Sequence, residues 1–292
     1  EVHIHHGQFP VKFPCVAGHE PVGEIAALGA GVTTLRVGDR VGVSWLQRGC
    51  GRCAQCQRGR AMYCADAQTW MTMGGGFSDL MLAWEEGCTL LPDGLDYEIA
   101  APVFCAGFTV MSGLRNAEPR PGDRVAVVGI GGLGHLALQV AAAYGFETIA
   151  VTSSPDKAAE AKRFGASAAV ISGGNAGEAL SKIGGADVIL STTNSAAQVS
   201  QVVAGLRPEG RLVSMGALDG PIQLDSIGLL MKQARIVGST QNRREDLLDA
   251  LALAASGKAR PVIETFPLSR LNEARDRLEA GKMRYRAVLL PE

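Results

Sequence analysis

A cluster of cysteines near the start of the chain has the spacing of a metal site, C-x2-C-x2-C-x7-C. Its members are Cys50, Cys53, Cys56 and Cys64. Thiolates this close in sequence can converge on one ion, and four of them complete the tetrahedral shell that a structural Zn²⁺ prefers. The surrounding lobe, residues 49–65, is polar and glycine-rich, so the metal would replace the packing that the loop lacks. Because four thiolates leave no coordination position open, we expect this zinc to organise structure and not to catalyse.

An iron–sulfur cluster and a set of disulfides are the competing interpretations of these cysteines. A four-iron ferredoxin pattern usually closes with a three-residue gap and a proline. Here the last gap has seven residues and Ala65 follows it. Disulfides are typical of oxidising compartments, whereas a long chain that also carries a nucleotide-binding pattern indicates reduced thiols. On that argument we expect a cytoplasmic protein, with a redox or disulfide role as the alternative.

A glycine-rich run in the middle of the chain matches the dinucleotide-binding pattern G-x-G-x-x-G. It follows an apolar strand at 125–128 and precedes a helix that starts near Leu133. In that context the glycines let backbone amides approach a pyrophosphate, which the positive end of the helix then holds. The alternative is a glycine-rich turn that binds nothing. The residues expected to contact the dinucleotide are Gly129, Gly131, Gly132, Leu133 and Gly134.

The end of the next strand indicates which dinucleotide is bound. An acidic residue there would bind the ribose 2′-hydroxyl of NAD and repel a 2′-phosphate. The sequence has Thr152, Ser153 and Ser154 at this place, and no carboxylate before Asp156. Ser154 can cap a helix that begins at Pro155, and the hydroxyls can surround a phosphate together with Lys157. We therefore expect NADP(H) rather than NAD(H), unless Ser154 is only a cap and Lys157 only a solvated side chain.

Two shorter motifs contain further metal-ligand types: Gly18-His19-Glu20, and Cys105 within 104–109. Taken alone, such a histidine or cysteine is more often structural than a ligand. In combination with the cysteine lobe and the glycine-rich run, however, they make the chain resemble the zinc-dependent medium-chain alcohol dehydrogenases over its entire length. The resemblance includes the cinnamyl alcohol dehydrogenase-like and bacterial NAD(P)-dependent members. The matching segments are Gly18-His19-Glu20, Val37-Gly38-Asp39-Arg40-Val41, the cysteine lobe, Gly75-Gly76-Phe77, Cys105-Ala106-Gly107-x-Thr109 and 129–134.

The resemblance implies a second, catalytic zinc, and thus two zinc ions per chain. His19 and Cys105 match family ligands, and Glu20 matches a nearby or alternative ligand. His3 matches the histidine that relays a proton to solvent through the cofactor ribose. The family's first zinc cysteine and its proton-passing Ser or Thr should lie immediately before the first residue, Glu1, which itself stands where the family usually has Asp. We therefore expect further residues upstream, with Cys15 as a less favoured substitute ligand.

The expected reaction is reversible oxidation of a primary alcohol, or reduction of an aldehyde, with hydride passing to or from the nicotinamide. Catalytic Thr109, together with Asn194 and Gly216, is expected beside the nicotinamide, because ligands bind at the carboxyl ends of parallel strands. A zinc-independent quinone or enoyl reductase and a nucleotide-binding redox sensor are the alternatives. The aromatic residues Trp45, Trp70 and Phe77 are candidates for an apolar substrate slot, or equally for ordinary core.

The elements that must position these residues change in character along the chain. Residues 1–106 contain short β segments among Gly and Pro, which predicts a mainly β, loop-rich domain. The resemblance implies that this is a GroES-like catalytic domain. Residues 107–241 alternate apolar strands with Ala-rich helices, which predicts a doubly wound parallel sheet of the Rossmann class. Residues 242–292 are expected to return to the first domain. They carry helical patterns at 244–256 and 269–280 and a final strand at 287–290.

Composition limits the partners of this chain. It has 292 residues, of which 47% are hydrophobic and 20% charged, as is ordinary for a globular protein. A net charge of -1 gives no electrostatic reason to expect nucleic acid or an anionic membrane surface as a partner. Apolar runs are interrupted before they reach the length of a membrane span. We expect a small-molecule alcohol or aldehyde as substrate, and the resemblance implies a homodimer or homotetramer.

Overall fold

The computed structural model describes residues 1–7, 11–241 and 243–292, and this part of the chain divides into two compact units. The first unit combines Glu1–Cys105 with Val262–Glu292. The second unit is Ala106–Pro261. Each unit has its own sheets and its own buried apolar clusters.

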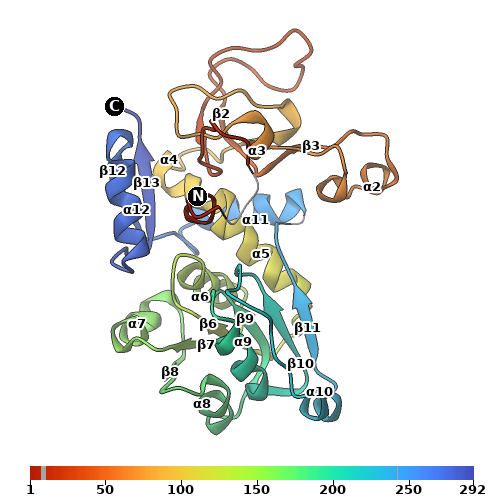
Figure 1. The fold of residues 1–292 in the computed structure, drawn as a ribbon, viewed down its shortest axis with the longest axis vertical. Coiled ribbons are helices and arrows are strands. Elements are labelled where there is room, and N and C mark those ends of the chain that lie inside the picture. The colour runs from red at the N-terminus through yellow and green to blue at the C-terminus, as the bar shows by residue number, and fades with distance from the viewer. Residues whose placement is uncertain (8–10, 242) are drawn as a thin grey trace. The chain divides into compact units, whose positions relative to one another are not determined.

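The second unit is built on a parallel sheet with the strand order β11-β10-β9-β6-β7-β8 (Figure 1). Its strands are β6 (Arg124–Val128), β7 (Glu147–Thr152), β8 (Ala168–Ile171), β9 (Ala186–Ser191), β10 (Leu206–Ser214) and β11 (Arg235–Gly238). The order runs outward from β6 through β7 to β8, and then restarts beside β6 with β9. This reversal is the topological switch point of a doubly wound sheet, so the predicted Rossmann class is confirmed.

Helices α6 (Gly134–Ala143), α7 (Pro155–Ala161), α8 (Ala176–Lys182), α9 (Ala196–Val202) and α10 (Ser226–Lys232) lie between the strands of this sheet in the chain. Helix α5 (Ala106–Asn116) precedes the first strand, and α11 (Arg244–Ala255) follows the last one. The first of the predicted βα units is found nearly as expected, since β6 includes the predicted 125–128 and α6 begins one residue after Leu133. Fully buried Val, Ile and Leu side chains of β6, β7, β9 and β10 form the core with the inner faces of α8 and α9. Such burial of strands on both faces is what near-continuous apolar runs predict.

The chain from 243 to 261 belongs to the second unit, so the return to the first unit begins at Val262 and not at the expected 242. Asp246 on α11 is 1% exposed and needs polar partners in the interior. The Ser112 hydroxyl donates to its Oδ2 atom at 2.7 Å, and Arg115 Nη1 contacts its Oδ1 atom at 2.6 Å. Both partners lie on α5, which ties α11 to this unit. The helical pattern itself carries no information on which neighbour the helix packs against.

The first unit is mainly β and rich in loops, as a GroES-like domain is. Strands β1 (Val22–Glu24), β2 (Arg40–Val43) and β5 (Cys88–Leu90) form an antiparallel sheet in the order β1-β2-β5. Two smaller pairs are β3 (Leu46–Arg48) with β4 (Gln68–Thr69), and the parallel pair β12 (Ile263–Pro267) with β13 (Arg286–Leu290). Its helices are α1 (Val2–His5), α2 (Ala54–Gln57), α3 (Trp70–Met73), α4 (Tyr97–Ala100) and α12 (Leu271–Glu279), with 3₁₀ turns η1 (Ala61–Tyr63), η2 (Glu85–Gly87), η3 (Ala101–Phe104) and η6 (Leu268–Arg270).

No single helix in the described residues is long and apolar enough to cross a membrane. The consecutive segments Tyr97–Phe104 and Ala106–Asn116 meet the length and composition requirement only when taken together, and they are interrupted by a bend.

Candidate functional site

The turn that carries His19 requires a glycine before it. Gly18 has a φ of +97°, and a Cβ atom there would lie 2.7 Å from Cδ1 and 2.8 Å from the backbone N of Phe77. Backbone hydrogen bonds join the two segments, from Gly76 N to Gly18 O at 2.8 Å and from Phe77 N to Ala17 O at 2.9 Å. Phe77, which the sequence suggested as a substrate contact, therefore packs against the turn that presents His19.

Glu1 fixes the orientation of the His19 ring. Its Oε1 atom accepts hydrogen bonds from the backbone N of His19 at 3.0 Å and from Nδ1 at 2.5 Å. Burial raises the pKa of Glu1, but the hydrogen bond and positive charge of His19 outweigh it and lower that pKa to about 2. An ionised carboxylate only accepts hydrogen bonds, so Nδ1 carries a proton, and Nε2 is the nitrogen that would bind a metal after it loses its own proton.

His19, Glu20 and Cys105 come together in the first unit. Their candidate ligand atoms all lie within 4.8 Å of one another, and His19 Nε2 is 3.6 Å from Glu20 Oε1. Burial lowers the pKa of His19, but the negative charges of Cys105 and Glu1 raise it well above its ordinary value. Imidazole, thiolate and carboxylate are the ligands that zinc takes in catalytic sites, so this donor set fits the ion that the resemblance implies.

Two other residues considered from the sequence do not join this group. Cys15 has a free thiol and is not part of a group of potential metal ligands in the described chain. His3 lies in α1, and its side chain is outside the described part of the structure.

Arg286 is a member of this site that the sequence reasoning missed. It starts β13, lies 266 residues after Glu20, and donates through Nη2 to Glu20 Oε1. Burial lowers the pKa of Arg286, but the charges of Glu20 and Cys105 raise it, so it stays protonated. The available signal was a single arginine at the start of an otherwise apolar strand, which the sequence alone could not connect to Glu20.

Two tryptophans surround His19. The ring centroid of Trp45 is 5.2 Å from that of His19 in a T-shaped arrangement, and the centroid of Trp70 is 6.1 Å away in a stacked one. The two indoles contact each other at 5.4 Å. Trp70 is only 1% exposed, so it packs as core beneath the histidine, whereas Trp45 is half-buried.

The cysteine lobe has the geometry of a tetrathiolate metal site. The Sγ atoms of Cys50, Cys53, Cys56 and Cys64 lie within 4.8 Å of one another, and all seven cysteines of the described chain have free thiols. Backbone N–H groups point at the sulfurs, from Cys53 to Cys50 at 3.3 Å and from Cys56 to Cys53 at 3.5 Å. Backbone hydrogen bonds from Arg52 and Cys53 lower the pKa of Cys50 to about 6. Burial raises the pKa of Cys56 to about 12, so the two shifts within the cluster oppose each other. The residues present fit the ion because four sulfurs lie close enough to share it.

The glycine-rich run forms the predicted strand–turn–helix. Gly129 follows β6 with a φ of +86°, and Gly134 is the first residue of α6. A Cβ atom on Gly134 would lie 1.9 Å from the carbonyl oxygen of Gly129. Only glycine permits this close approach of the helix to the turn, which is the geometry of a dinucleotide-binding loop.

The segment after β7 has the predicted helix cap. Ser154 is the N-cap of α7, and its Oγ atom accepts from Lys157 N at 3.4 Å. The backbone N of Ser154 donates to Thr152 Oγ1 at 3.2 Å. Ser153 is exposed. The place that would carry an acidic residue in an NAD site therefore presents hydroxyl groups.

The residues predicted near the nicotinamide all lie in the second unit. A Cβ atom on Gly216 would lie 2.3 Å from Thr193 O and 3.4 Å from Asn194 Oδ1, so Gly216 and Asn194 are neighbours at the carboxyl ends of β10 and β9. Thr109 lies on α5 and is buried.

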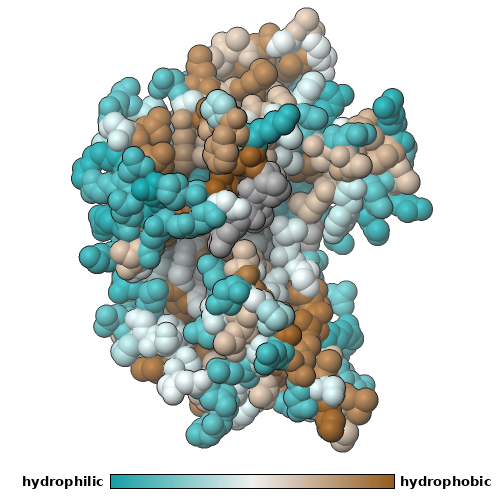
Figure 2. Space-filling view, in the orientation of Figure 1, coloured by the Kyte–Doolittle hydropathy of each residue, from teal (hydrophilic) through white to brown (hydrophobic). Residues whose placement is uncertain are grey.

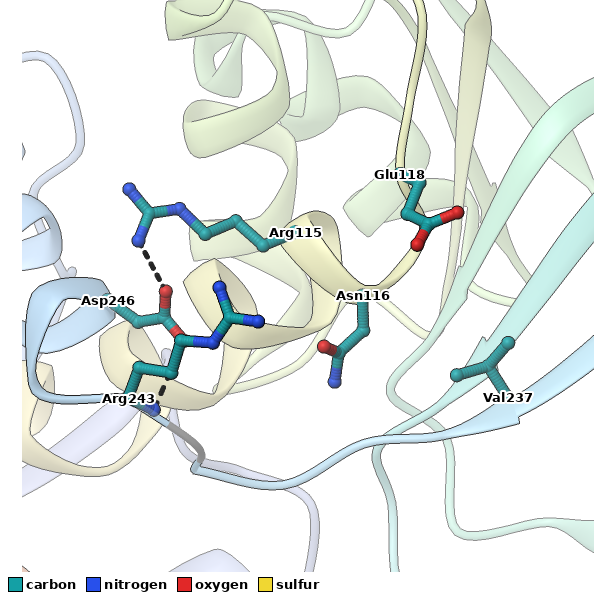
Figure 3. A pocket seen from close by; sticks show the side chains of 6 residues that line it. All are labelled: Arg115, Asn116, Glu118, Val237, Arg243 and Asp246. Carbon is teal, nitrogen blue, oxygen red and sulfur yellow. Dashed lines mark hydrogen bonds and ion pairs between the residues drawn. The ribbon is translucent and has the colours of Figure 1, made fainter. Parts of the chain in front are cut away.

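A polar pocket of about 280 Å³ in the same unit is not one of the predicted sites (Figure 3). It is lined by Arg115, Asn116, Glu118, Val237, Arg243 and Asp246. Its charges are already paired, because Arg115 contacts Asp246 and Asp249, and Arg243 lies 3.3 Å from Glu245. The pocket thus belongs to the packing of α11 on α5.

The chain is similar to known proteins over most of its length. Residues 132–256 match the family described as zinc-binding dehydrogenase, and residues 1–93 match the alcohol dehydrogenase GroES-like domain. An alcohol dehydrogenase of Geobacillus stearothermophilus is 36% identical over 294 residues, covering 99% of this chain and 87% of that protein. The structure of a cinnamyl alcohol dehydrogenase from Sorghum bicolor has a TM-score of 0.87 at 32% identity, covering 95% of this chain and 82% of that chain. Acetophenone reductase from Geotrichum candidum, solved in complex with NAD, has a TM-score of 0.86 at 27% identity, covering 99% of this chain and 84% of that chain.

Proposed function

Because the chain belongs to the zinc-dependent medium-chain alcohol dehydrogenase family, we propose that it passes hydride between NADP(H) and a primary alcohol or aldehyde. The observation that carries the proposal is the convergence of His19, Glu20 and Cys105 within 4.8 Å. A zinc-independent reductase would need neither this group nor the cysteine lobe.

His19 and Cys105 would hold the catalytic zinc, which when bound supplies a Lewis acid for the substrate oxygen. Glu1 keeps the His19 ring in the tautomer that leaves Nε2 unprotonated. Arg286 holds the carboxylate of Glu20 and balances its charge beside the thiolate. The lobe cysteines would hold the structural zinc. We assign His3 the transfer of the substrate proton toward solvent, on the family resemblance.

The nucleotide is bound by the second unit in this proposal. The loop 129–134 and the amino end of α6 take the pyrophosphate. Ser153, Ser154 and Lys157 take the 2′-phosphate of NADP(H), because this position offers hydroxyls and a cation and no carboxylate. Thr109, Asn194 and Gly216 lie beside the nicotinamide. The NAD bound to the acetophenone reductase supports a dinucleotide for this fold and leaves the preference for NADP(H) to experiment.

We propose that the indole of Trp45 lines the substrate site beside the catalytic zinc and limits its size. Trp70 supports it from below, since it is buried and contacts both Trp45 and His19. Two large rings beside the metal ligand leave little room for a bulky carbonyl substituent. We therefore propose primary alcohols and aldehydes as substrates.

The test combines metal analysis with an assay of NADPH-dependent aldehyde reduction. The wild type should contain two zinc ions per chain and turn over. Cys105→Ala should lose one zinc and turnover, and should keep its Kd for NADPH within about twofold, because Cys105 touches no nucleotide in this proposal. Cys15→Ala is the matched control and should retain both zinc ions. Loss of NADPH affinity in Cys105→Ala contradicts the assigned role, and one zinc without turnover in the wild type supports the redox-sensor alternative.

We also propose that the chain self-associates through the open edge of the second unit's sheet. Strand β11 ends the sheet, and the neighbouring helix α10 exposes Ile227, Leu230 and Met231 by 72–74% (Figure 2). An apolar helix beside an unpaired strand edge is a surface that soluble monomers rarely leave uncovered. Light scattering should give a dimer or tetramer mass, and Leu230→Glu should shift it toward the monomer. A monomeric wild type overturns this assignment.

A further inference from the structure

Thr192 lies directly after β9, beside the glycine-rich loop of the neighbouring strand β6. Its Oγ1 atom is 2.5 Å from Gly129 O and 3.1 Å from Val128 O. Its backbone N already donates to Val128 O at 3.0 Å. Because a hydroxyl has one proton, the shorter distance makes Gly129 O the acceptor of the Thr192 hydroxyl.

The Gly129 carbonyl is the point at which the loop meets the helix that follows. Gly129 has a φ of +86°, and its carbonyl oxygen would lie 1.9 Å from a Cβ atom on Gly134, the first residue of α6. The same Cβ would lie 3.0 Å from Thr192 Oγ1. The hydroxyl therefore sits in the same narrow space as the start of α6. By holding the carbonyl, it fixes the direction of the peptide group that begins the loop.

The hydroxyl of the neighbouring Thr193 makes different hydrogen bonds. Its Oγ1 atom interacts with Gln198 Oε1 at 2.8 Å and accepts from Ser195 N at 3.2 Å. Both contacts lie in the turn that begins α9 and do not include the loop. The backbone and Cβ atom of Thr193 also face Gly129, at 3.1–3.3 Å from the position of a Cβ atom there. The two threonines therefore differ in their hydroxyl hydrogen bonds, which go to the loop from Thr192 and to the turn from Thr193.

We propose that Thr192 is a positioning residue for the dinucleotide, which rests on the proposed function of this loop. Its hydroxyl holds the loop in the conformation whose backbone N–H groups meet the pyrophosphate. Without the hydroxyl, the loop becomes ordered only when the dinucleotide binds. The free energy of ordering the loop then weakens dinucleotide binding. Thr192 touches no reacting atom, so the rate at saturating dinucleotide does not depend on it.

The test compares Thr192→Val, Thr192→Ser and Thr193→Val by fluorescence titration with NADPH and with NADH. Losing one hydrogen bond should raise the Kd of both dinucleotides about five- to tenfold in Thr192→Val. Thr192→Ser retains the hydroxyl and should stay within about twofold of the wild type, as should Thr193→Val. The kcat for aldehyde reduction at saturating NADPH should change by less than about twofold in all three, because only binding is affected.

The outcomes separate the two proposals. A Thr192→Val protein with the dinucleotide affinity of the wild type overturns the positioning role and leaves the proposed function intact. A wild type that binds neither NADPH nor NADH overturns the proposed function and the positioning role with it. If Thr192→Val does not fold, Thr192→Ala takes its place as the variant without a hydroxyl, and its Kd is compared with that of Thr192→Ser. Equal Kd values for these two variants overturn the positioning role of Thr192.

Discussion

A single carboxylate oxygen of Glu1, Oε1, accepts both the side-chain Nδ1–H and the backbone N–H of His19, at 2.5 and 3.0 Å. The histidine is therefore held at its main chain and at its ring by one group. Such a partner fixes the tautomer and raises the basicity of a metal-binding histidine.

Glu1→Gln should weaken zinc binding at the catalytic position about 10- to 100-fold, because the amide cannot stabilise the Nδ1–H as a carboxylate does. Competition with a chelator measures the affinity. The exposed Asp93 offers a matched control, and Asp93→Asn should bind zinc as the wild type does. Equal affinities of Glu1→Gln and Asp93→Asn would show that Glu1 does not tune the ligand.

Removal of one lobe thiolate should release the structural zinc. Cys56→Ser leaves three thiolates, so zinc content should fall by one ion per chain and residues 49–65 should lose protection from hydrogen exchange. Cys88→Ser, outside the cluster, controls for loss of a thiol in the same unit. A lobe that stays protected without metal would mean that packing, and not zinc, holds it.

The dinucleotide preference should depend on Lys157. Lys157→Ala should raise the KM for NADPH about tenfold and leave the KM for NADH within about twofold, because only NADPH carries the 2′-phosphate. Lys162 lies at the other end of the same helical segment and is exposed. Lys162→Ala should change neither value, and a parallel loss for both dinucleotides in Lys157→Ala would argue against phosphate recognition.

Asp246 should be more important for stability than its neighbour Asp249. Asp246 is 1% exposed and contacts Ser112 and Arg115, and Figure 3 shows its ion pair with Arg115. The Asp249 side chain is 46% exposed and contacts Arg115. Urea unfolding should show a loss of about 2–3 kcal/mol for Asp246→Asn and less than about 1 kcal/mol for Asp249→Asn. Similar losses of unfolding free energy in the two variants would contradict the expectation that the buried carboxylate contributes more than the exposed one.

Glu85 should contribute to the pH dependence of stability. Hydrogen bonds from the side chain and backbone N–H of Thr34, and from Thr33 N, lower the pKa of Glu85. A pKa that is lower in the folded state stabilises the protein above the unfolded value of about 4.3, and this contribution disappears as the pH falls through the folded value. The unfolding free energies of wild type and Glu85→Gln should therefore converge between about pH 6 and pH 3. If the difference in unfolding free energy between wild type and Glu85→Gln stays constant over that pH range, Glu85 does not contribute to the pH dependence of stability.

Local patterns determined much of this protein from the sequence alone. The cysteine lobe, the strand–turn–helix around 129–134 and the cap at Ser154 each lie within a short stretch, where ligand spacing, glycine conformation and capping act between near neighbours. Strands β8 and β12 were not predicted. Strand β8 has only four residues, of which one is buried, and β12 depends on pairing with β13.

Tertiary structure decided which distant residues meet. Glu20 and Arg286 are separated by 266 positions, and Asp246 finds its partners on a helix more than a hundred residues earlier. These contacts follow from how strands pair and helices pack, because a buried charge takes whichever partner the fold brings within reach. The sequence thus determined the kinds of site present, whereas the folded chain selected the neighbours that set their charge and orientation.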